Sequence, residues 1–188
     1  CLVGALLGGR GGDPVIAEAA TTTLGLPAAG RYAAVCVSAA GPDPDACGRR
    51  LGQVLTAYRV HSLWRSRMDR ELGIVLLGDL TVQRLASLLA GQVEQPIGAS
   101  AEVAGLGQLG VAAAQAELAA ATLTPSEPAV ALLDDRLPEA LLVSAAPLAD
   151  RLRDKYLGRI LELPDEERDV LLGTLDVWLR TGRSAALT

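Results

Sequence analysis

Residues 60–77 read Val60-His61-Ser62-Leu63-Trp64-Arg65-Ser66-Arg67-Met68-Asp69-Arg70-Glu71-Leu72-Gly73-Ile74-Val75-Leu76-Leu77. In the first half, apolar and charged side chains alternate, with Val60, Trp64 and Met68 on one side and Arg65 and Arg67 on the other. A period of two is typical of a half-buried strand. The second half is almost wholly apolar, which favours a central strand covered on both faces. The stretch therefore predicts a β-hairpin whose polar tip is Asp69-Arg70-Glu71.

The composition predicts a globular chain with an aliphatic core. Half of the 188 residues are hydrophobic, aromatic residues make up 3%, and phenylalanine is absent. This length suits one domain with an appendage, or two small domains. The net charge is −5 at neutral pH. Because nucleic-acid-binding domains usually carry a basic face, we expect these residues not to bind DNA by themselves.

The sequence shows neither a membrane span nor a secretion signal. No apolar run reaches the eighteen or so residues of a transmembrane helix, and residues 2–7 are too short for the apolar core of a signal peptide. The cysteines, Cys1, Cys36 and Cys47, form no C-x-x-C pair, and Cys36 is expected to be a small buried residue within a strand. These observations predict a reduced, cytoplasmic protein that does not contact a membrane.

Strands and helices alternate through most of the chain. Strands are expected at residues 31–39, 60–68, 72–77, 97–103 and 129–133, and helices at 14–24, 43–58, 81–90 and 106–123. Asp13 is expected to cap the first of these helices, and Asp43 with Pro44 to begin the second. The order β-α-β-β-α-β-α-β contains the split, ferredoxin-like arrangement and predicts an α+β fold with a mixed sheet. Residues 1–30 are expected to form a helical lead-in to a domain at 31–136.

Residues 137–188 are expected to be helical. Helices are predicted at residues 137–143, from Pro147 and from Asp165. The second carries an apolar stripe of Leu148, Leu152 and Tyr156, and the third one of Leu171, Leu175, Trp178 and Leu179. Since such stripes need a partner, we expect a homodimer. Both ends of the chain read as boundaries of a fragment.

Short segments in a fixed order resemble one known family. They are Leu6-Leu7-Gly8-Gly9, Leu24-Gly25-Leu26-Pro27, Gly30-Arg31-Tyr32, Ile97-Gly98-Ala99-Ser100, Gln115-Ala116-Glu117-Leu118-Ala119, Leu171-Leu172-Gly173-Thr174-Leu175 and Trp178-Leu179. Together they resemble the PucR/CdaR class of bacterial transcription regulators over nearly the whole chain. The resemblance implies a degenerate GGDEF (nucleotidyl-cyclase-like) domain at 31–136, preceded by a sensor. Residues 137–188 would then be a linker and the start of a C-terminal helix-turn-helix, through which alone the protein would contact DNA.

The expected hairpin tip lacks the residues of an active cyclase. Such enzymes carry Gly-Gly-Asp/Glu-Glu-Phe there, with glycines that let the nucleotide approach and carboxylates that hold metal. The corresponding residues are Met68-Asp69-Arg70-Glu71-Leu72, and the end of the first strand, residues 38–41, has no carboxylate. We therefore interpret Asp69 and Glu71 as solvated turn residues and predict no catalytic, cofactor-binding or metal-binding residues.

Two further patterns leave alternatives open. Residues 105–110, Gly105-Leu106-Gly107-Gln108-Leu109-Gly110, match the G-x-G-x-x-G fingerprint for a dinucleotide such as NAD, although the hairpin upstream does not suit a parallel nucleotide-binding half-sheet. Residues 8–12 are also rich in glycine, but no Gly-Lys-Ser/Thr follows, which favours a plain loop. The single histidine, His61, has no partner for a zinc site and is expected to be an ordinary strand residue.

The favoured hypothesis is a catalytically inactive GGDEF-like domain that supports dimerisation and signal relay in a transcription regulator. The first alternative is a module that senses a nucleotide or another small molecule, and the second is a dinucleotide-dependent enzyme. The sequence does not indicate the effector, the operator or the regulated pathway.

Overall fold

A computed structural model describes residues 1–38, 43, 45–124 and 129–180 of the chain. The chain divides into two units, Cys1–Ser144 and Ala145–Thr188. The elements of the first unit are α1 Leu2–Leu7, α2 Pro14–Leu24, β1 Arg31–Ser38, α3 Ala46–Ala57, β2 His61–Arg67, β3 Arg70–Leu76, α4 Val82–Leu89, β4 Ile97–Ala99, β5 Val103–Ala104, α5 Leu109–Ala121, β6 Val130–Leu132 and α6 Leu137–Ser144, with 3₁₀ turns at Arg10–Gly12, Leu106–Gln108 and Leu133–Arg136.

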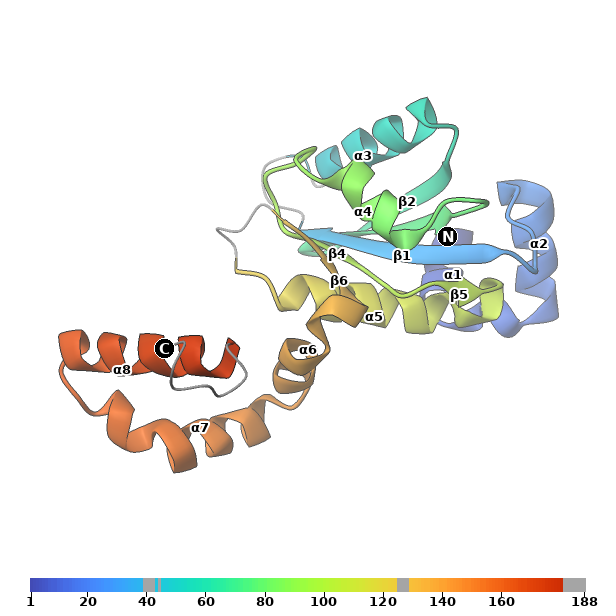
Figure 1. The fold of residues 1–188 in the computed structure, drawn as a ribbon. Helices are drawn as coiled ribbons and strands as arrows, with labels where there is room; N and C mark the ends of the chain where they lie inside the picture. Colours follow the sequence, from blue (N-terminus) through green and yellow to red (C-terminus); the bar gives the residue numbers. More distant parts are fainter. Residues whose placement is uncertain (39–42, 44, 125–128, 181–188) are drawn as a thin grey trace. The chain divides into compact units, whose positions relative to one another are not determined.

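The first unit is built on a six-stranded mixed sheet, which confirms the predicted α+β fold (Figure 1). The strand order is β2-β3-β1-β4-β6, and β5 pairs with the end of β1. All of these pairings are antiparallel except β4 with β6, which are joined through α5. The predicted hairpin is β2-β3, and its apolar arm β3 lies between β2 and β1, as the run of apolar residues indicated.

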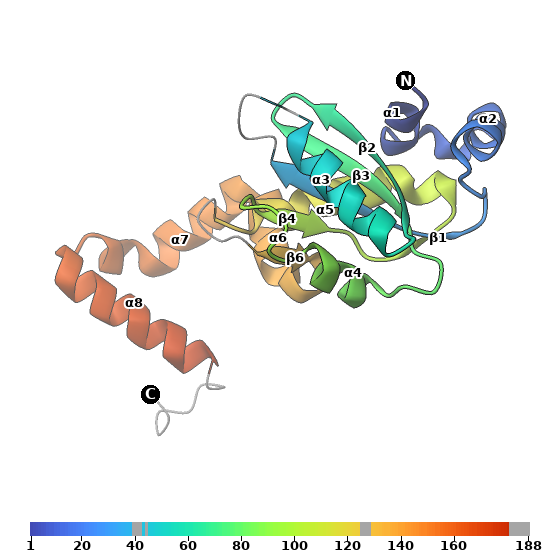
Figure 2. The same ribbon diagram turned by 90° about the horizontal axis from the view of Figure 1, so that it is seen from above.

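The alternation of side chains along β1 divides the core into two layers. Ala33, Val35 and Val37 pack with α3 and α4 on one face of the sheet. Tyr32 packs with the α1–α2 region on the other face, where Ala34 and Cys36 meet α5. Helices therefore cover both faces of the sheet, as Figure 1 and Figure 2 show. Because β1 is buried on both sides, its sequence is a continuous apolar run rather than an alternating one.

The structure corrects two predicted boundaries. The strand expected at 97–103 is interrupted, because the Ser100 hydroxyl oxygen accepts the backbone N–H of Ala34 at 2.9 Å and donates to the Ala101 carbonyl, so β4 ends at Ala99. The helix expected from residue 43 begins at Ala46. There the Asp43 carboxylate accepts the N–H of Asp45, a local turn that delays the helix.

The second unit contains two helices, α7 Ala146–Leu161 and α8 Asp165–Arg180. The stripe predicted on α7 is open to solvent, with Leu148 61%, Leu152 51% and Tyr156 68% exposed. On α8, Leu175 and Trp178 are half-buried, whereas Leu171 is 44% exposed. The side chain of Leu179 lies outside the described residues. Among the helices of the described ranges, none is long and apolar enough to cross a bilayer.

Candidate functional site

The hairpin tip is a two-residue turn, shorter than the sequence indicated. Residues pair in register up to Arg67 opposite Arg70, which leaves Met68 and Asp69 as the turn. Arg70 and Glu71, expected in the tip, are strand residues. Met68 has φ 51° and is 96% exposed, so a side chain occupies a left-handed position that favours glycine. In active cyclases this part of the hairpin carries the glycine pair.

Glu71 is a buried residue, and its assignment as a solvated turn residue was wrong. It is 2% exposed and faces the α3 side of the sheet. One carboxylate oxygen, Oε2, accepts the backbone N–H of Gly48 at 2.9 Å, in the first turn of α3. The other oxygen, Oε1, has no hydrogen-bond partner among the described residues. Burial raises the pKa of Glu71 above its usual range, and the bond from Gly48 only partly opposes this effect.

The indole ring of Trp64 lies close to Glu71 and fills a space left by glycines. A Cβ atom at Gly73 would lie 2.9 Å from three ring atoms of Trp64, and one at Gly48 would lie 3.0 Å from the ring. A Cβ atom at Gly48 would also lie within contact distance of the Glu71 carboxylate. The indole and the backbone of α3 thus occupy the space around Glu71.

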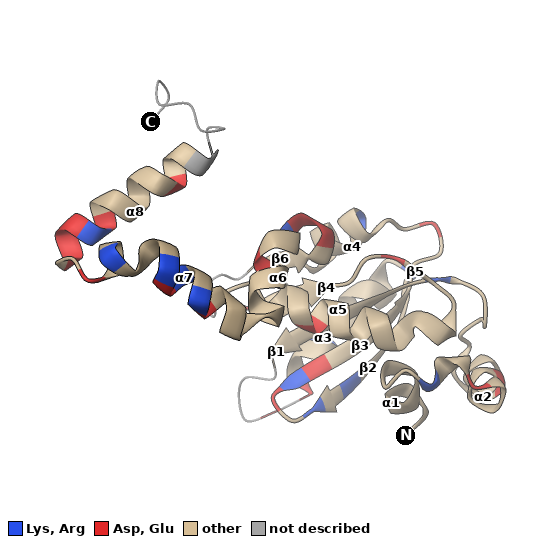
Figure 3. Ribbon diagram, turned by 90° about the horizontal axis from the view of Figure 1, so that it is seen from below, with Lys and Arg blue, Asp and Glu red and all other residues tan. Residues whose placement is uncertain are grey.

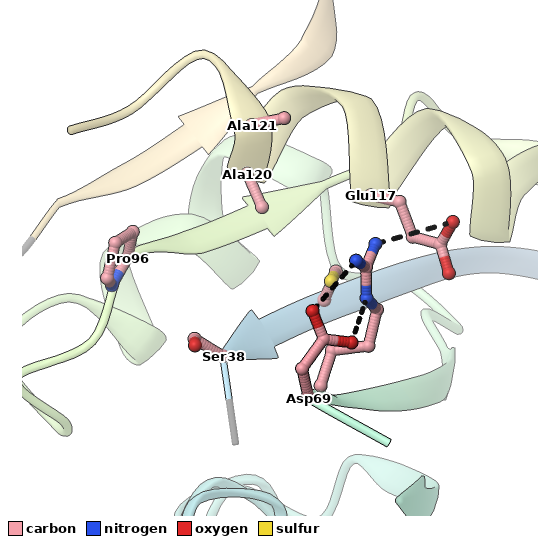
Figure 4. Close-up of a pocket in the computed structure, with 8 residues that line it drawn as sticks. Ser38, Asp69, Pro96, Glu117, Ala120 and Ala121 are labelled. Carbon is pink, nitrogen blue, oxygen red and sulfur yellow. Dashed lines mark hydrogen bonds and ion pairs between the residues drawn. The ribbon is translucent and has the colours of Figure 1, made fainter. Parts of the chain in front are cut away.

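Asp69 and Arg70 lie together on the opposite side of the sheet, beside α5. Arg70 Nε and Nη2 donate to the two carboxylate oxygens of Asp69 at 3.1 and 3.2 Å, and Arg70 Nη1 is 3.8 Å from Glu117 Oε2 (Figure 4). The bonds from Arg70 lower the pKa of the Asp69 carboxyl. These groups line a cavity of about 170 Å³ with Cys36 and Ser38, among others. Burial raises the pKa of the Cys36 thiol to about 12, which disfavours the reactive thiolate form at neutral pH.

The structure therefore separates the two carboxylates that the sequence placed in one tip. Asp69 is held by Arg70 on the α5 face, whereas Glu71 is held by the α3 backbone on the other face. Ser38 ends β1 beside Arg70, and residues 39–41 of the same stretch lie outside the described residues. Within the described ranges, no three His, Cys, Asp or Glu side chains are grouped so that they could hold a metal ion.

The glycine fingerprint at 105–110 packs against the glycine-rich segment at 8–12. A Cβ atom at Gly110 would lie 2.4 Å from the Cα atom of Gly9, and one at Gly11 would lie 2.0 Å from the carbonyl oxygen of Leu106. The two backbones are in contact where a pyrophosphate would have to lie. The preceding strand, β5, runs antiparallel to β1 rather than forming a parallel nucleotide-binding unit. These glycines thus serve packing between two distant segments.

His61 is an exposed strand residue whose Nε2 lies 3.1 Å from the carbonyl oxygen of Leu24. This contact links β2 to the end of α2. Sequence reasoning also missed Glu117, whose only signal was an isolated charge in the Ala-rich helix α5.

Comparisons with known proteins agree with this architecture. The structure is similar to the crystal structure of a regulator of polyketide synthase expression from Bifidobacterium adolescentis, with a TM-score of 0.57 and 18% sequence identity. The match covers 97% of this chain and 76% of the other. At this identity the likeness shows the fold. No curated protein sequence matches the chain.

The family assignment comes from the sequence match and agrees with the sheet topology. The sequence model of the GGDEF-like domain matches residues 8–122, more than half of the chain. These residues run from the end of α1 to the end of α5 and include the β2-β3 hairpin with its altered tip. The chain therefore belongs to the GGDEF-like domain family.

Proposed function

We propose that this chain is part of a bacterial transcription regulator of the PucR/CdaR type, in which the GGDEF-like domain is not catalytic and supports dimerisation and signal relay. The observation that carries the proposal is the separation of Asp69 and Glu71 onto different faces of the hairpin. The similar fold of a regulator of polyketide synthase expression also supports a regulatory role.

Metal-assisted cyclisation of a nucleotide requires carboxylates that converge on the same ions. Asp69 is engaged by Arg70, whose guanidinium adds positive charge where a cyclase would hold a cation. Glu71 has one oxygen engaged by a backbone N–H, and its raised pKa disfavours the ionised form that binds metal. This arrangement favours a structural role for both residues.

Relay in this proposal runs from the sheet through α5 into the C-terminal helices. Ala140 of α6 is buried in a cluster with Ala119 of α5 and with Ala131 and Leu133, so α6 is anchored to the domain. The chain continues from α6 into α7. DNA would be contacted by a segment outside residues 1–188, because the net charge of these residues is −5.

Dimerisation in this proposal uses the apolar stripe of α7. Leu148, Leu152 and Tyr156 recur at intervals of four residues and are all more than half exposed. Side chains at this spacing lie on the same helix face. A second copy of the stripe would bury them.

We expect the chain to form a homodimer, or a monomer–dimer equilibrium, in light-scattering and sedimentation measurements. The double variant Leu148→Glu/Leu152→Glu should raise the dimer dissociation constant about tenfold or more, because two charges would be buried at the contact. The control is Val111→Glu, which changes an exposed apolar residue of α5 in the first unit. A wild-type chain that stays monomeric at high concentration, or a dimer that the double variant leaves intact, would refute this role of α7.

A further inference from the structure

A second cavity lies on the α1 side of the hairpin and shares no lining residue with the cavity beside Asp69. It has a volume of about 290 Å³ and is lined by Gly4, Leu7, Gly8, Arg65, Arg67 and Leu72. None of these lining residues carries a carboxylate. Figure 3 shows basic residues on β2 and β3, with α1 beside these strands. Small-ligand sites begin at about this volume and combine apolar walls with a few polar groups.

Arg65 and Arg67 bring uncompensated positive charge to this cavity. Both side chains are exposed, and neither forms an ion pair or hydrogen bond with any described part of the chain. Each guanidinium offers five N–H donors in a planar fork that fits phosphate and carboxylate oxygens. The chain as a whole is acidic, with a net charge of −5, so this pair is not part of a generally basic surface.

The neighbouring strand adds to the positive charge. Arg67 lies directly opposite Arg70 in the hairpin register, and like charges at such positions are unfavourable. Arg70 is neutralised by Asp69 and Glu117, whereas Arg67 is not. An anion beside Arg65 and Arg67 would relieve this repulsion. Residues two apart on a strand point to the same face, so both guanidinium groups are available to one ligand.

At this cavity the Arg65 side chain of β2 contacts α1 at Gly4. A Cβ atom added at Gly4 would lie 1.1 Å from Arg65 Nη1 and 2.4 Å from Arg65 Cζ. The guanidinium of Arg65 therefore lies close against the backbone of α1 at Gly4, where a larger residue would displace it. This contact brings the Arg65 guanidinium next to α1, on the side of the hairpin that the cavity occupies.

We propose that the cavity between α1 and β2 binds a small organic anion that carries two phosphate or carboxylate groups, with Arg65 and Arg67 as its ligands. Leu7 and Leu72 supply apolar walls for a short ligand body. This site is separate from the Asp69–Arg70 cavity and does not depend on the proposed regulatory role. It gives a GGDEF-like domain without cyclase chemistry a place for a small-molecule signal.

Isothermal titration of the whole chain with pyrophosphate and, separately, citrate at physiological ionic strength tests the proposal. We expect saturable binding of at least one probe, and the preferred probe distinguishes phosphate from carboxylate recognition. Arg65→Gln and Arg67→Gln should each weaken binding about tenfold, as expected when a hydrogen bond to a charged group is lost. Arg84→Gln is the matched control, because Arg84 is an exposed arginine of α4, which covers the other face of the sheet.

Gly4→Ala separates a built site from general electrostatic attraction. This variant keeps every charge but forces the Arg65 guanidinium to move, so binding should weaken several-fold while the circular dichroism spectrum is unchanged. The proposal is overturned if neither probe binds the wild-type chain, if the two arginine variants bind as well as wild type, or if Arg84→Gln weakens binding as much as they do. Unchanged affinity in Gly4→Ala would equally overturn it, since Arg65 would then act only as a diffuse charge.

Discussion

Gly98→Ala is expected to destabilise the first unit by roughly 3 kcal/mol or more, at or above the usual upper limit for overpacking a core. Gly98 lies in β4, paired with β1 on one side and β6 on the other. An added Cβ atom would lie 2.1 Å from the carbonyl oxygen of Ala116 and 2.2 Å from the nitrogen of Ala120. Because both are backbone atoms of α5, no side-chain rotation removes the clash, and the helix must move off the sheet.

The expected loss of stability follows from the core residues of β1 that α5 covers. Ala112, Ala113 and Ala116 pack against Ala34 and Cys36 of β1, so a shift of the helix opens this layer of the core. Since domains of this size are stable by only about 5–15 kcal/mol, the variant should unfold at a clearly lower urea concentration.

Gly173→Ala serves as the control, since a Cβ atom there meets nothing within 4 Å and alanine favours the helix α8. It should not lower stability. A Gly98→Ala chain within about 0.5 kcal/mol of wild type, the range of ordinary surface substitutions, would show that β4 and α5 are not so closely packed.

The second large effect concerns Gly107 and Gly110, two glycines of the G-x-G-x-x-G fingerprint at residues 105–110. Gly110→Ala should cost about 2–3 kcal/mol, because its Cβ atom would lie 2.4 Å from the Cα atom and 2.7 Å from the nitrogen of Gly9. Gly107→Ala should be close to neutral, because its Cβ atom would make only ordinary contacts, at 3.6 and 3.7 Å from Gly12. Urea denaturation of both variants measures the difference.

This pair of variants distinguishes packing from dinucleotide binding. In a dinucleotide fingerprint both positions matter, because one glycine admits the pyrophosphate and another permits close helix packing. Of these two positions, only Gly110 lies too close to a neighbouring backbone to accept a Cβ atom in this structure. Equal costs for the two variants, or a rise in the melting temperature of wild type on addition of NAD, would contradict the packing account.

Local sequence patterns predicted much of the fold. Asp13 and Pro14 located the start of α2, and the Asp13 side chain accepts the N–H of Val15 as expected for a cap. The apolar residues 72–77 correctly indicated a central strand. These successes share a cause, since capping and strand burial depend on residues that are adjacent in sequence.

The position of Glu71 was mispredicted although its signal was present. Counting back by two from Val75 and Gly73, which face α3, places Glu71 on the same buried face. The polar triplet Asp69-Arg70-Glu71 suggested a longer tip, but the turn uses only Met68 and Asp69. The residue type at position 68 did not indicate a turn there, because a bulky residue such as Met68 rarely takes a positive φ angle.

Contacts between distant segments had no local signal. The packing of Gly110 on Gly9 and the placement of Arg65 over Gly4 join residues far apart in the chain. In isolation Gly9 and Gly110 looked like loop or ligand-binding residues, and Gly4 looked like an ordinary residue of the expected helical lead-in. The pattern of residues in one segment cannot report which backbone lies against it, and this is why the cavity between α1 and β2 emerged only from the structure.

The most direct test of the central claim, that this GGDEF-like domain does not catalyse nucleotide cyclisation, is incubation of the chain with GTP and either Mg²⁺ or Mn²⁺, with an active cyclase run in parallel. Asp69 paired with Arg70, and Glu71 buried against α3, leave no convergent carboxylates at the hairpin tip. The account predicts no cyclic dinucleotide above the level of a protein-free reaction. Formation of such a product by the wild-type chain would contradict it.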